Sequence, residues 1–357
     1  MVIVISKIKI LVVDDSAMVR KMLSMELAKD SAIEVLDTAV DPYVARDKII
    51  ELKPDVVLLD VEMPRMDGIT FLRKLMRYYP SRVIIVSSLA KSGGEVALAA
   101  IEYGAMDVMA KPSVSYSVSE MIEQLIDKIK EVAQIPMWRV QEIAKRKLAA
   151  LDTNEVFNRD KKIGQAMIKT TNKIIAIGAS TGGTVAIREI LQSLPSNTPP
   201  IVIVQHMPEY FTKSFAEGLD KVCSMKVKEA EDNEILSVGK ALIAPGNYHL
   251  SVKRSGAVYY SKISQEERIF HQRPAVEVLF NSLAKCAGKN SIGVILTGMG
   301  KDGARGLLNM KNEGAFTISQ DERTSIVFGM PKEAIEIGAV DSVKPIGSIA
   351  GEILKKL

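Results

Sequence analysis

The most constraining feature of this chain is a stretch that changes character twice between residues 173 and 191. Residues 173–177, a lysine followed by four apolar residues, are typical of a buried strand, and residues 178–183 read Gly-Ala-Ser-Thr-Gly-Gly. Apolar residues then recur at helical spacing over 185–191. Strand, glycine-rich turn and helix in this order predict a βα unit, whose turn presents backbone N–H groups at the start of a helix. The chain therefore contains an α/β layer with Ser180 on one of its turns.

This turn fits three kinds of structure: a nucleophile elbow of the Gly-x-Ser-x-Gly type, a phosphate-binding loop, or only a tight connection. A Walker-type phosphate loop needs a lysine before its final Ser or Thr, and residues 178–183 contain none. A dinucleotide-binding unit needs an acidic residue at the end of the next strand, where this chain has Gln205 and His206. Phosphate loops and nicotinamide cofactors are therefore disfavoured.

Length and composition indicate two domains in a reducing compartment. The chain has 357 residues, which is more than one typical domain, and its net charge of +4 gives no indication of nucleic-acid binding. Its two cysteines, Cys223 and Cys286, lie far apart in the sequence, which disfavours a disulfide or a zinc site. The apolar start is too short for a signal peptide, and no run of 18 apolar residues follows. We expect a cytoplasmic protein.

Residues 8–126 predict a first domain with a doubly wound parallel sheet, because five short apolar runs alternate there with helical patterns. Polar residues stand at the carboxyl ends of these strands: Asp14, Asp15, Asp60, Ser87 and Lys111. Since parallel strands end at one edge of a sheet, these side chains should lie close together. Three carboxylates favour Mg²⁺, and a lysine with a hydroxyl can bind phosphoryl oxygens. Any one of them could be a helix cap or a solvated strand end, but five at matching strand ends favour phosphoryl chemistry.

Residues 127–168 predict a partly helical linker, and residues 169–357 a second doubly wound, mostly parallel α/β domain with a small antiparallel hairpin. Ser180, His206 and Asp302 each follow a predicted parallel strand, where they could meet as nucleophile, base and orienting carboxylate. Simpler interpretations exist for each: Ser180 as a helix cap, His206 as a surface residue, Asp302 as the cap of a helix starting at 304. Spacing alone leaves these alternatives open.

The motifs Leu11–Ser16, Leu58–Gly68, Val86–Ser88 and Ala110–Pro112 resemble those of receiver domains in two-component response regulators. The resemblance implies that Asp60 accepts a phosphoryl group from a partner histidine kinase. It further implies that Asp14, Asp15, Asp60 and the Glu62 backbone form a Mg²⁺ site. Ser87 and Lys111 would form the phosphate switch. Receivers often carry an aromatic switch residue three positions before this lysine, and Val108 stands there instead.

Motifs of the second domain resemble the catalytic domain of the CheB family of chemotaxis receptor methylesterases: Gly178–Gly183, Gln205–Pro208, Ala244–His249, Arg273–Phe280, Thr297–Gly303, Gln320–Glu322 and Phe328–Pro331. The resemblance implies a phosphorylation-activated hydrolase. It would remove methyl groups from glutamyl γ-methyl esters of chemoreceptors, and would convert selected receptor glutamines to glutamate. Ala275 and Glu277 replace the serine and aspartate usual in the family.

The same resemblance implies the roles of individual residues. Ser180, His206 and Asp302 would form a catalytic triad, and the backbone N–H groups of Met299 and Thr181 would stabilise the oxyanion. The hydrolase would need no cofactor of its own. Its partners would be the receptors and the chemotaxis histidine kinase, without nucleic acid, and it would reach the membrane only through the receptors.

Overall fold

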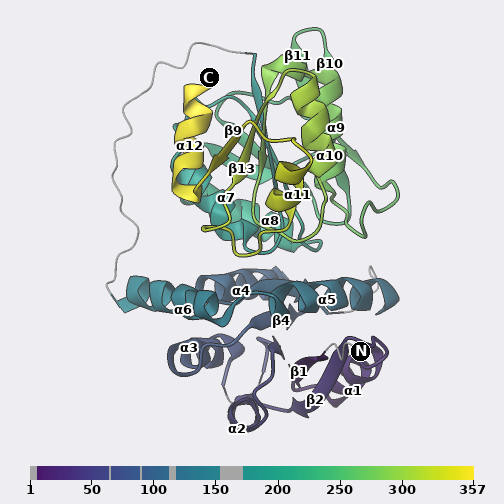
Figure 1. Cartoon of the computed structure of the whole chain (residues 1–357), viewed down its shortest axis with the longest axis vertical. Helices are drawn as coiled ribbons and strands as arrows, with labels where there is room; N and C mark the ends of the chain where they lie inside the picture. Colours follow the sequence, from purple (N-terminus) through teal and green to yellow (C-terminus); the bar gives the residue numbers. More distant parts are fainter. Residues whose placement is uncertain (1–5, 64–65, 89–90, 112–117, 153–171) are drawn as a thin grey trace. The chain divides into compact units, whose positions relative to one another are not determined.

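The computed structural model describes residues 6–63, 66–88, 91–111, 118–152 and 172–357. The chain separates into two compact units, Met1–Arg159 and Asp160–Leu357, which are drawn together in Figure 1. Residues 153–168 of the predicted linker, and its expected boundary with the second domain, lie outside the described residues. Each unit is an α/β structure, as the sequence predicts.

The first unit is built on a five-stranded sheet of order β2-β1-β3-β4-β5, in which every pairing is parallel. Its elements are β1 (Ile8–Val13), α1 (Ala17–Leu27), β2 (Ile33–Ala39), α2 (Pro42–Leu52), β3 (Val56–Leu59), α3 (Gly68–Tyr78), β4 (Val83–Ser87), α4 (Lys91–Glu102), β5 (Asp107–Ala110), α5 (Val118–Ala133) and α6 (Met137–Asp152). Strands β3, β4 and β5 are buried throughout, which explains their continuous apolar runs.

Local capping sets where several of these helices begin. Asp41 accepts hydrogen bonds from the first N–H groups of α2, and proline occupies that helix's first position. Asp67 caps α3 in the same way. Helix α6, which the sequence places in the linker, starts after Pro136 and packs against α3, burying Val140 and Ala144. This helix therefore belongs to the first unit.

The second unit is built on a seven-stranded sheet of order β14-β13-β12-β6-β7-β9-β8, with every pairing parallel. Its elements are β6 (Ile174–Ala179), α7 (Gly183–Gln192), β7 (Ile201–Gln205), α8 (Phe211–Asp220), β8 (Lys226–Glu229), β9 (Lys240–Ile243), β10 (His249–Ser255), β11 (Val258–Ser264), α9 (Val276–Cys286), the 3₁₀ turn Gly288–Asn290, β12 (Ser291–Ile295), α10 (Ala304–Asn312), β13 (Phe316–Gln320), α11 (Met330–Glu336), β14 (Ser342–Lys344) and α12 (Ile346–Lys355). Strands β10 and β11 form the predicted antiparallel hairpin.

Helices cover the sheet of the second unit on both sides. Helices α7 and α12 pack together, and α9 packs against α10, so that the strands lie between the two pairs (Figure 1). Helix α11 and strand β14 are not predicted from the sequence. Helix α11 has only seven residues and carries a proline in its first turn, and β14 has three residues, none of them buried. Neither is long enough to show a periodic apolar pattern.

Candidate functional sites

Each unit has one point where the order of its parallel strands reverses, and the predicted site residues lie there. In the first unit this point is between β1 and β3, followed by Asp14 and Asp60 respectively. In the second it is between β6 and β12, followed by Ser180 and the 297–303 loop. Loops diverge at such points and leave a crevice beyond the carboxyl ends of the strands, which is where α/β proteins bind ligands.

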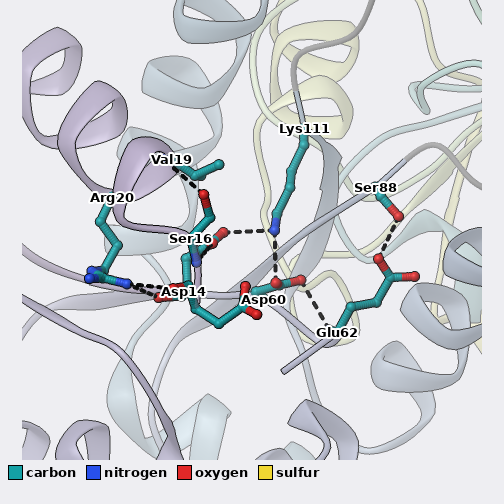
Figure 2. A network of polar contacts seen from close by, with 9 residues as sticks. Asp14, Ser16, Val19, Arg20, Asp60, Glu62, Ser88 and Lys111 are labelled. Carbon is teal, nitrogen blue, oxygen red and sulfur yellow. Dashed lines mark hydrogen bonds and ion pairs between the residues drawn. The ribbon is translucent and has the colours of Figure 1, made fainter. Parts of the chain in front are cut away.

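The predicted carboxylates of the first unit lie together. Oxygen atoms of Asp14, Asp15 and Asp60 lie within 4.8 Å of one another, with Asp14 and Asp60 buried and Asp15 exposed. Lys111 reaches into this group from the end of β5, and its Nζ lies 2.7 Å from Asp60 Oδ2 and 2.8 Å from Asp14 Oδ2 (Figure 2). The strand ends thus bring together one cation and three anions.

Two further predicted residues complete this site. Ser87 is fully buried, and its Oγ has no hydrogen-bond partner within the described residues. The Glu62 N–H donates to Asp60 Oδ1 at 3.1 Å, while the Glu62 side chain accepts a hydrogen bond from Ser88 Oγ at 2.6 Å (Figure 2). A buried polar atom without a partner is costly, and such an atom often marks a site that a ligand completes.

The charges of this cluster fit a divalent cation. Burial raises the pKa of Asp60, although Lys111 offsets part of that shift. Burial acts to lower the pKa of Lys111, but its hydrogen bonds with Asp14 and Asp60 outweigh burial and raise it. Three carboxylates against one ammonium leave excess negative charge, and hard oxygen ligands of this kind suit Mg²⁺.

Arg20 is a residue of this site that the sequence analysis does not identify. Its Nη1 donates to the backbone carbonyls of Asp14, at 2.7 Å, and Asp15, at 2.9 Å, from the first turn of α1 (Figure 2). Ser16 caps that helix by accepting from the Val19 N–H. The acidic loop is therefore held by the helix that follows it. An arginine on α1 gave no signal, because its partners are backbone carbonyls.

In the second unit, Ser180 lies in the turn between β6 and α7 and is buried. It does not cap α7: the N-cap is Gly182, which has φ 80°, and no side chain caps the helix. A Cβ at Gly183 would lie 2.1 Å from Gln205 Oε1, so that a side chain there would push Gln205 away from the turn. The two glycines are needed for backbone conformation and close packing.

His206 and Asp302 lie in contact. The Nε2 atom of His206 is 2.7 Å from Asp302 Oδ2, and both side chains are buried. Asp302 also accepts hydrogen bonds from the backbone N–H groups of Val276, at 2.7 Å, and Glu277, at 2.8 Å. It therefore caps α9, and the interpretation that it caps the helix starting at 304 is wrong. The interpretation of His206 as a surface residue is also wrong.

Among the residues that the structure describes, Ser180, the third member of the predicted triad, is not hydrogen-bonded to His206. Within the described residues, no hydrogen bond joins Ser180 Oγ to the His206 ring. Since Nε2 faces Asp302, Nδ1 is the ring nitrogen left to accept a proton from a hydroxyl. Catalytic hydrogen bonds of this kind are often formed only when substrate is bound.

The peptide groups that carry the Thr181 and Met299 N–H are held through their carbonyls. The Ser180 carbonyl accepts from Gly183 N–H at 2.7 Å and from Gln205 Nε2 at 2.9 Å. The Gly298 carbonyl accepts from the N–H groups of Gly329, at 3.0 Å, and Met330, at 2.8 Å. In a trans peptide the N–H points opposite to the carbonyl, so both N–H directions are fixed.

A second buried histidine forms a hydrogen bond at the N-terminus of α9. His249 Nδ1 accepts from Ala275 N–H at 3.2 Å, and its Nε2 lies 2.9 Å from the Glu267 carbonyl. Burial lowers the pKa of His249, and an Nδ1 that accepts requires the neutral ring. Glu277 accepts from Gly306 N–H at 3.0 Å and so links α9 to α10.

Comparisons with known proteins agree across the whole chain. Residues 175–353 match the family model described as CheB methylesterase, and residues 10–123 match the response regulator receiver domain. A protein-glutamate methylesterase/protein-glutamine glutaminase 2 of Syntrophus aciditrophicus is 54% identical over 98% of this chain and 99% of its own length. A protein-glutamate methylesterase/protein-glutamine glutaminase of Sulfurimonas denitrificans is 51% identical, covering 98% of each chain.

Among solved structures, the crystal structure of the Thermotoga maritima CheB methylesterase catalytic domain is similar to the second unit. It is 42% identical, has a TM-score of 0.51, and the match covers 52% of this chain and 98% of that one.

Proposed function

Because this chain belongs to the CheB methylesterase family and has its receiver domain as well, we propose that it is a phosphorylation-activated protein-glutamate methylesterase and protein-glutamine glutaminase. Its receiver would span residues 8–126 and its catalytic domain residues 169–357, joined by the linker 127–168. Its substrates would be chemotaxis receptors, for which it would serve adaptation. The observation that carries the proposal is the buried His206–Asp302 pair at the strand-order reversal that also holds Ser180.

In the proposed reaction, Ser180 Oγ attacks the γ-carbonyl carbon of a glutamyl methyl ester while His206 Nδ1 takes its proton. Asp302 keeps the other ring proton on Nε2 and stabilises the imidazolium that forms. The carbonyl C–O bond to the methoxy group then breaks, and His206 gives its proton to the leaving methanol. Water, activated by the same histidine, releases the glutamate from Ser180. A glutamine side chain would follow the same steps and release ammonia.

The N–H groups of Thr181 and Met299 are the proposed donors to the oxyanion. Both belong to peptide groups whose carbonyls accept two hydrogen bonds each, so their directions are set before substrate arrives. Preorganised donors of this kind are worth about 2.7–4 kcal/mol each in the transition state. Each of the two N–H donors should therefore contribute to the rate in addition to the serine hydroxyl.

Asp60 is the proposed phosphoryl acceptor, with a histidine kinase as its partner. Asp14, Asp15, Asp60 and the Glu62 backbone would hold Mg²⁺, which neutralises negative charge on the transferring phosphoryl group. The buried hydroxyl of Ser87 and the ammonium of Lys111 would bind phosphoryl oxygens once Asp60 is modified. We propose that phosphorylation then raises the rate of the catalytic domain.

We propose further that the protein works in the cytoplasm and meets the membrane only through its receptor substrates. The chain has only two cysteines, Cys223 and Cys286, far apart in the sequence, which supports a reducing compartment. In the described part of the chain, no helix has the length and apolar character needed to cross a bilayer.

The test is methanol release from membranes that contain methylated chemoreceptors. Wild-type protein should release methanol, faster when acetyl phosphate and Mg²⁺ are added, and Ser180→Ala should release none above background. Asp60→Asn should keep the basal rate and lose the response to acetyl phosphate. Full methanol release by Ser180→Ala would exclude Ser180 as nucleophile, and a wild-type protein that binds receptors without releasing methanol would be a scaffold instead of an esterase.

A further inference from the structure

We infer that Thr297 is a positioning residue for ester hydrolysis, which fixes the nucleophile turn through its own carbonyl and hydroxyl groups. The inference rests on the proposed function of Ser180 and deepens it. Thr297 lies between the end of β12 and the loop that leads to Asp302, and it is buried. It has no place in the proposed chemistry, since other residues supply the nucleophile, the base and the oxyanion donors.

Thr297 contacts the turn on both sides of the Ser180–Thr181 peptide. Its carbonyl accepts from the Ser180 N–H at 3.0 Å, which fixes the peptide before the serine. Its hydroxyl donates to the Thr181 carbonyl at 2.9 Å, which fixes the peptide after Thr181. The peptide between them carries the proposed Thr181 N–H donor. A single residue therefore holds both neighbours of that peptide.

The same hydroxyl also bonds to Val327, which lies next to the Gly298–Met299 segment. It accepts from the Val327 N–H at 3.0 Å, and the Val327 carbonyl, 3.2 Å away, is a second and longer acceptor for its proton. The Val327 carbonyl also accepts from the Gly298 N–H at 3.0 Å. Gly329 and Met330, which follow Val327 closely in the chain, donate to the Gly298 carbonyl. Through Val327, Thr297 thus connects the two peptide groups proposed to bind the oxyanion.

The chain gives Thr297 a fixed position from which to do this. Its N–H donates to the buried Gln320 Oε1 at 2.9 Å, and Gln320 Nε2 donates to Thr324 Oγ1 at 3.3 Å. The Thr297 methyl group lies 3.3 Å from where a Cβ on Gly182 would be. Threonine therefore packs against the turn with its methyl group and bonds to it with its hydroxyl.

Substitution can separate these roles. Thr297→Val keeps the backbone bonds and the shape but removes the hydroxyl, which leaves the Thr181 carbonyl and the Val327 N–H without it. Thr297→Ser keeps the hydroxyl and loses only the methyl group. Thr317→Val is a matched control: Thr317 is also buried, its hydroxyl donates to Asp341 Oδ2 at 2.9 Å and accepts from Asp341 N–H at 3.0 Å, and neither contact involves the turn.

The experiment measures kcat and KM for methanol release by the full-length proteins, and the rate at which a fluorophosphonate probe labels Ser180. A small displacement of reacting groups costs about 100-fold in rate, so Thr297→Val should lose about that factor in kcat and in labelling. Its KM should change by about twofold or less, because the lost interaction acts in the transition state. Thr297→Ser should recover most of kcat, and Thr317→Val should keep the wild-type kcat.

Equal kcat values for Thr297→Val and Thr317→Val, with a wild-type enzyme that is active, would overturn the inference and leave the proposed function standing. A wild-type protein that neither releases methanol nor is labelled would instead refute the proposed function. Thr297→Ala makes the same test without a branched side chain if Thr297→Val does not fold. A loss of kcat in Thr297→Ser as large as that in Thr297→Val would show that the methyl group, and not the hydroxyl, matters.

Discussion

The two sites of this molecule occupy the same topological place but handle charge in opposite ways. Each lies where strand order reverses in a parallel sheet. In the first unit, the groups at that place are ionised side chains, with Lys111 paired to Asp14 and Asp60. In the second, the proposed oxyanion donors are neutral peptide groups, and the buried carboxylate of Asp302 is engaged by His206 and the start of α9.

The two units use different groups because the charges that they would stabilise last for different times. A phosphoryl group and a divalent cation carry permanent charge, which ionised side chains neutralise best. An oxyanion exists only in the transition state, and a permanent charge facing it would have to be desolvated in every resting enzyme. Peptide dipoles held in place by their carbonyls avoid that cost. Variants that remove one charge should therefore act very differently in the two units.

The largest effect should come from the carboxylate of the second unit. Asp302→Asn should lower kcat for methanol release by about 10⁴-fold, since an amide cannot hold His206 in the tautomer that leaves Nδ1 as the base. Asp60→Asn, the equivalent charge removal in the first unit, should leave basal kcat unchanged. Steady-state kinetics without a phosphodonor make the comparison.

Asp341→Asn controls for loss of stability in the same unit. Asp341 accepts from the Thr317 N–H and hydroxyl and pairs with Lys311, far from the triad in its contacts. It should lower the unfolding temperature without lowering kcat. If Asp302→Asn kept more than a tenth of wild-type kcat, Asp302 would only be the cap of α9.

The sequence predicts both sites because their residues stand directly after apolar runs. A strand that ends on Asp60, or one followed by Ser180, locates a side chain at a sheet edge without knowledge of strand order. The sequence does not predict which groups within each site contact one another. The alternative interpretation of Asp302, as the cap of the helix that follows it, is wrong, because its N–H partners are Val276 and Glu277 on α9. Which helix N-terminus lies nearest depends on the packing of the folded unit.

A second, smaller effect should come from the lysine of the first unit. Lys111→Met leaves Asp14 and Asp60 without their cation, and breaking a buried pair in this way costs about 3 kcal/mol of unfolding free energy. Mg²⁺ should restore more stability to Lys111→Met than it adds to the wild type, because the ammonium competes with the metal for the same oxygens. The only tryptophan, Trp138, lies on α6 of the first unit, so its fluorescence follows this unfolding in urea.

Lys128→Met provides the control within that unit. Lys128 Nζ pairs with Asp107 Oδ2 at 2.6 Å, and both side chains are largely buried. Asp107 is the first residue of β5, so this pair lies at the amino end of the strand, whereas Lys111 follows its carboxyl end. This variant should be destabilised as well, with a Mg²⁺ response like that of the wild type. Equal Mg²⁺ stabilisation of Lys111→Met and wild type would mean that the lysine and the metal do not share ligands.

Some residues of the second site act through backbone atoms, and the sequence does not indicate their contacts, although Gln205 and Thr297 lie within the motifs that resemble the family. Thr297 and Gln205 bond to carbonyls and N–H groups of the turn, and any residue type supplies those partners. No spacing rule marks them, because their partners lie far along the chain. His249 is similar: it is buried, and its Nδ1 accepts from the backbone N–H of Ala275.

The smallest effect is a difference in how the two units respond to acid. All three histidines, including His249, lie in the second unit. Burial lowers the pKa of His249, so the stability it contributes is present above the unfolded pKa of about 6.5 and is lost as pH falls below it, by up to about 1.4 kcal/mol per pH unit. Burial raises the pKa of Asp60, so its contribution in the first unit is lost as pH rises instead. Acidification from pH 7.5 to 5.5 should therefore weaken the second unit and not the first.

His249→Gln tests whether this histidine is the cause. Glutamine keeps an oxygen to accept from Ala275 N–H and an N–H to donate to the Glu267 carbonyl, but it does not titrate. Hydrogen exchange of the full chain, compared at β10 and α9 and at β3 and β4, reports each unit separately. His249→Gln should remove the acid-dependent rise in exchange at β10 and α9, whereas His271→Gln, at an exposed position of the same unit, should keep it. If exchange at β3 and β4 rose with acid as steeply as at β10, the prediction that acid weakens only the second unit would be wrong.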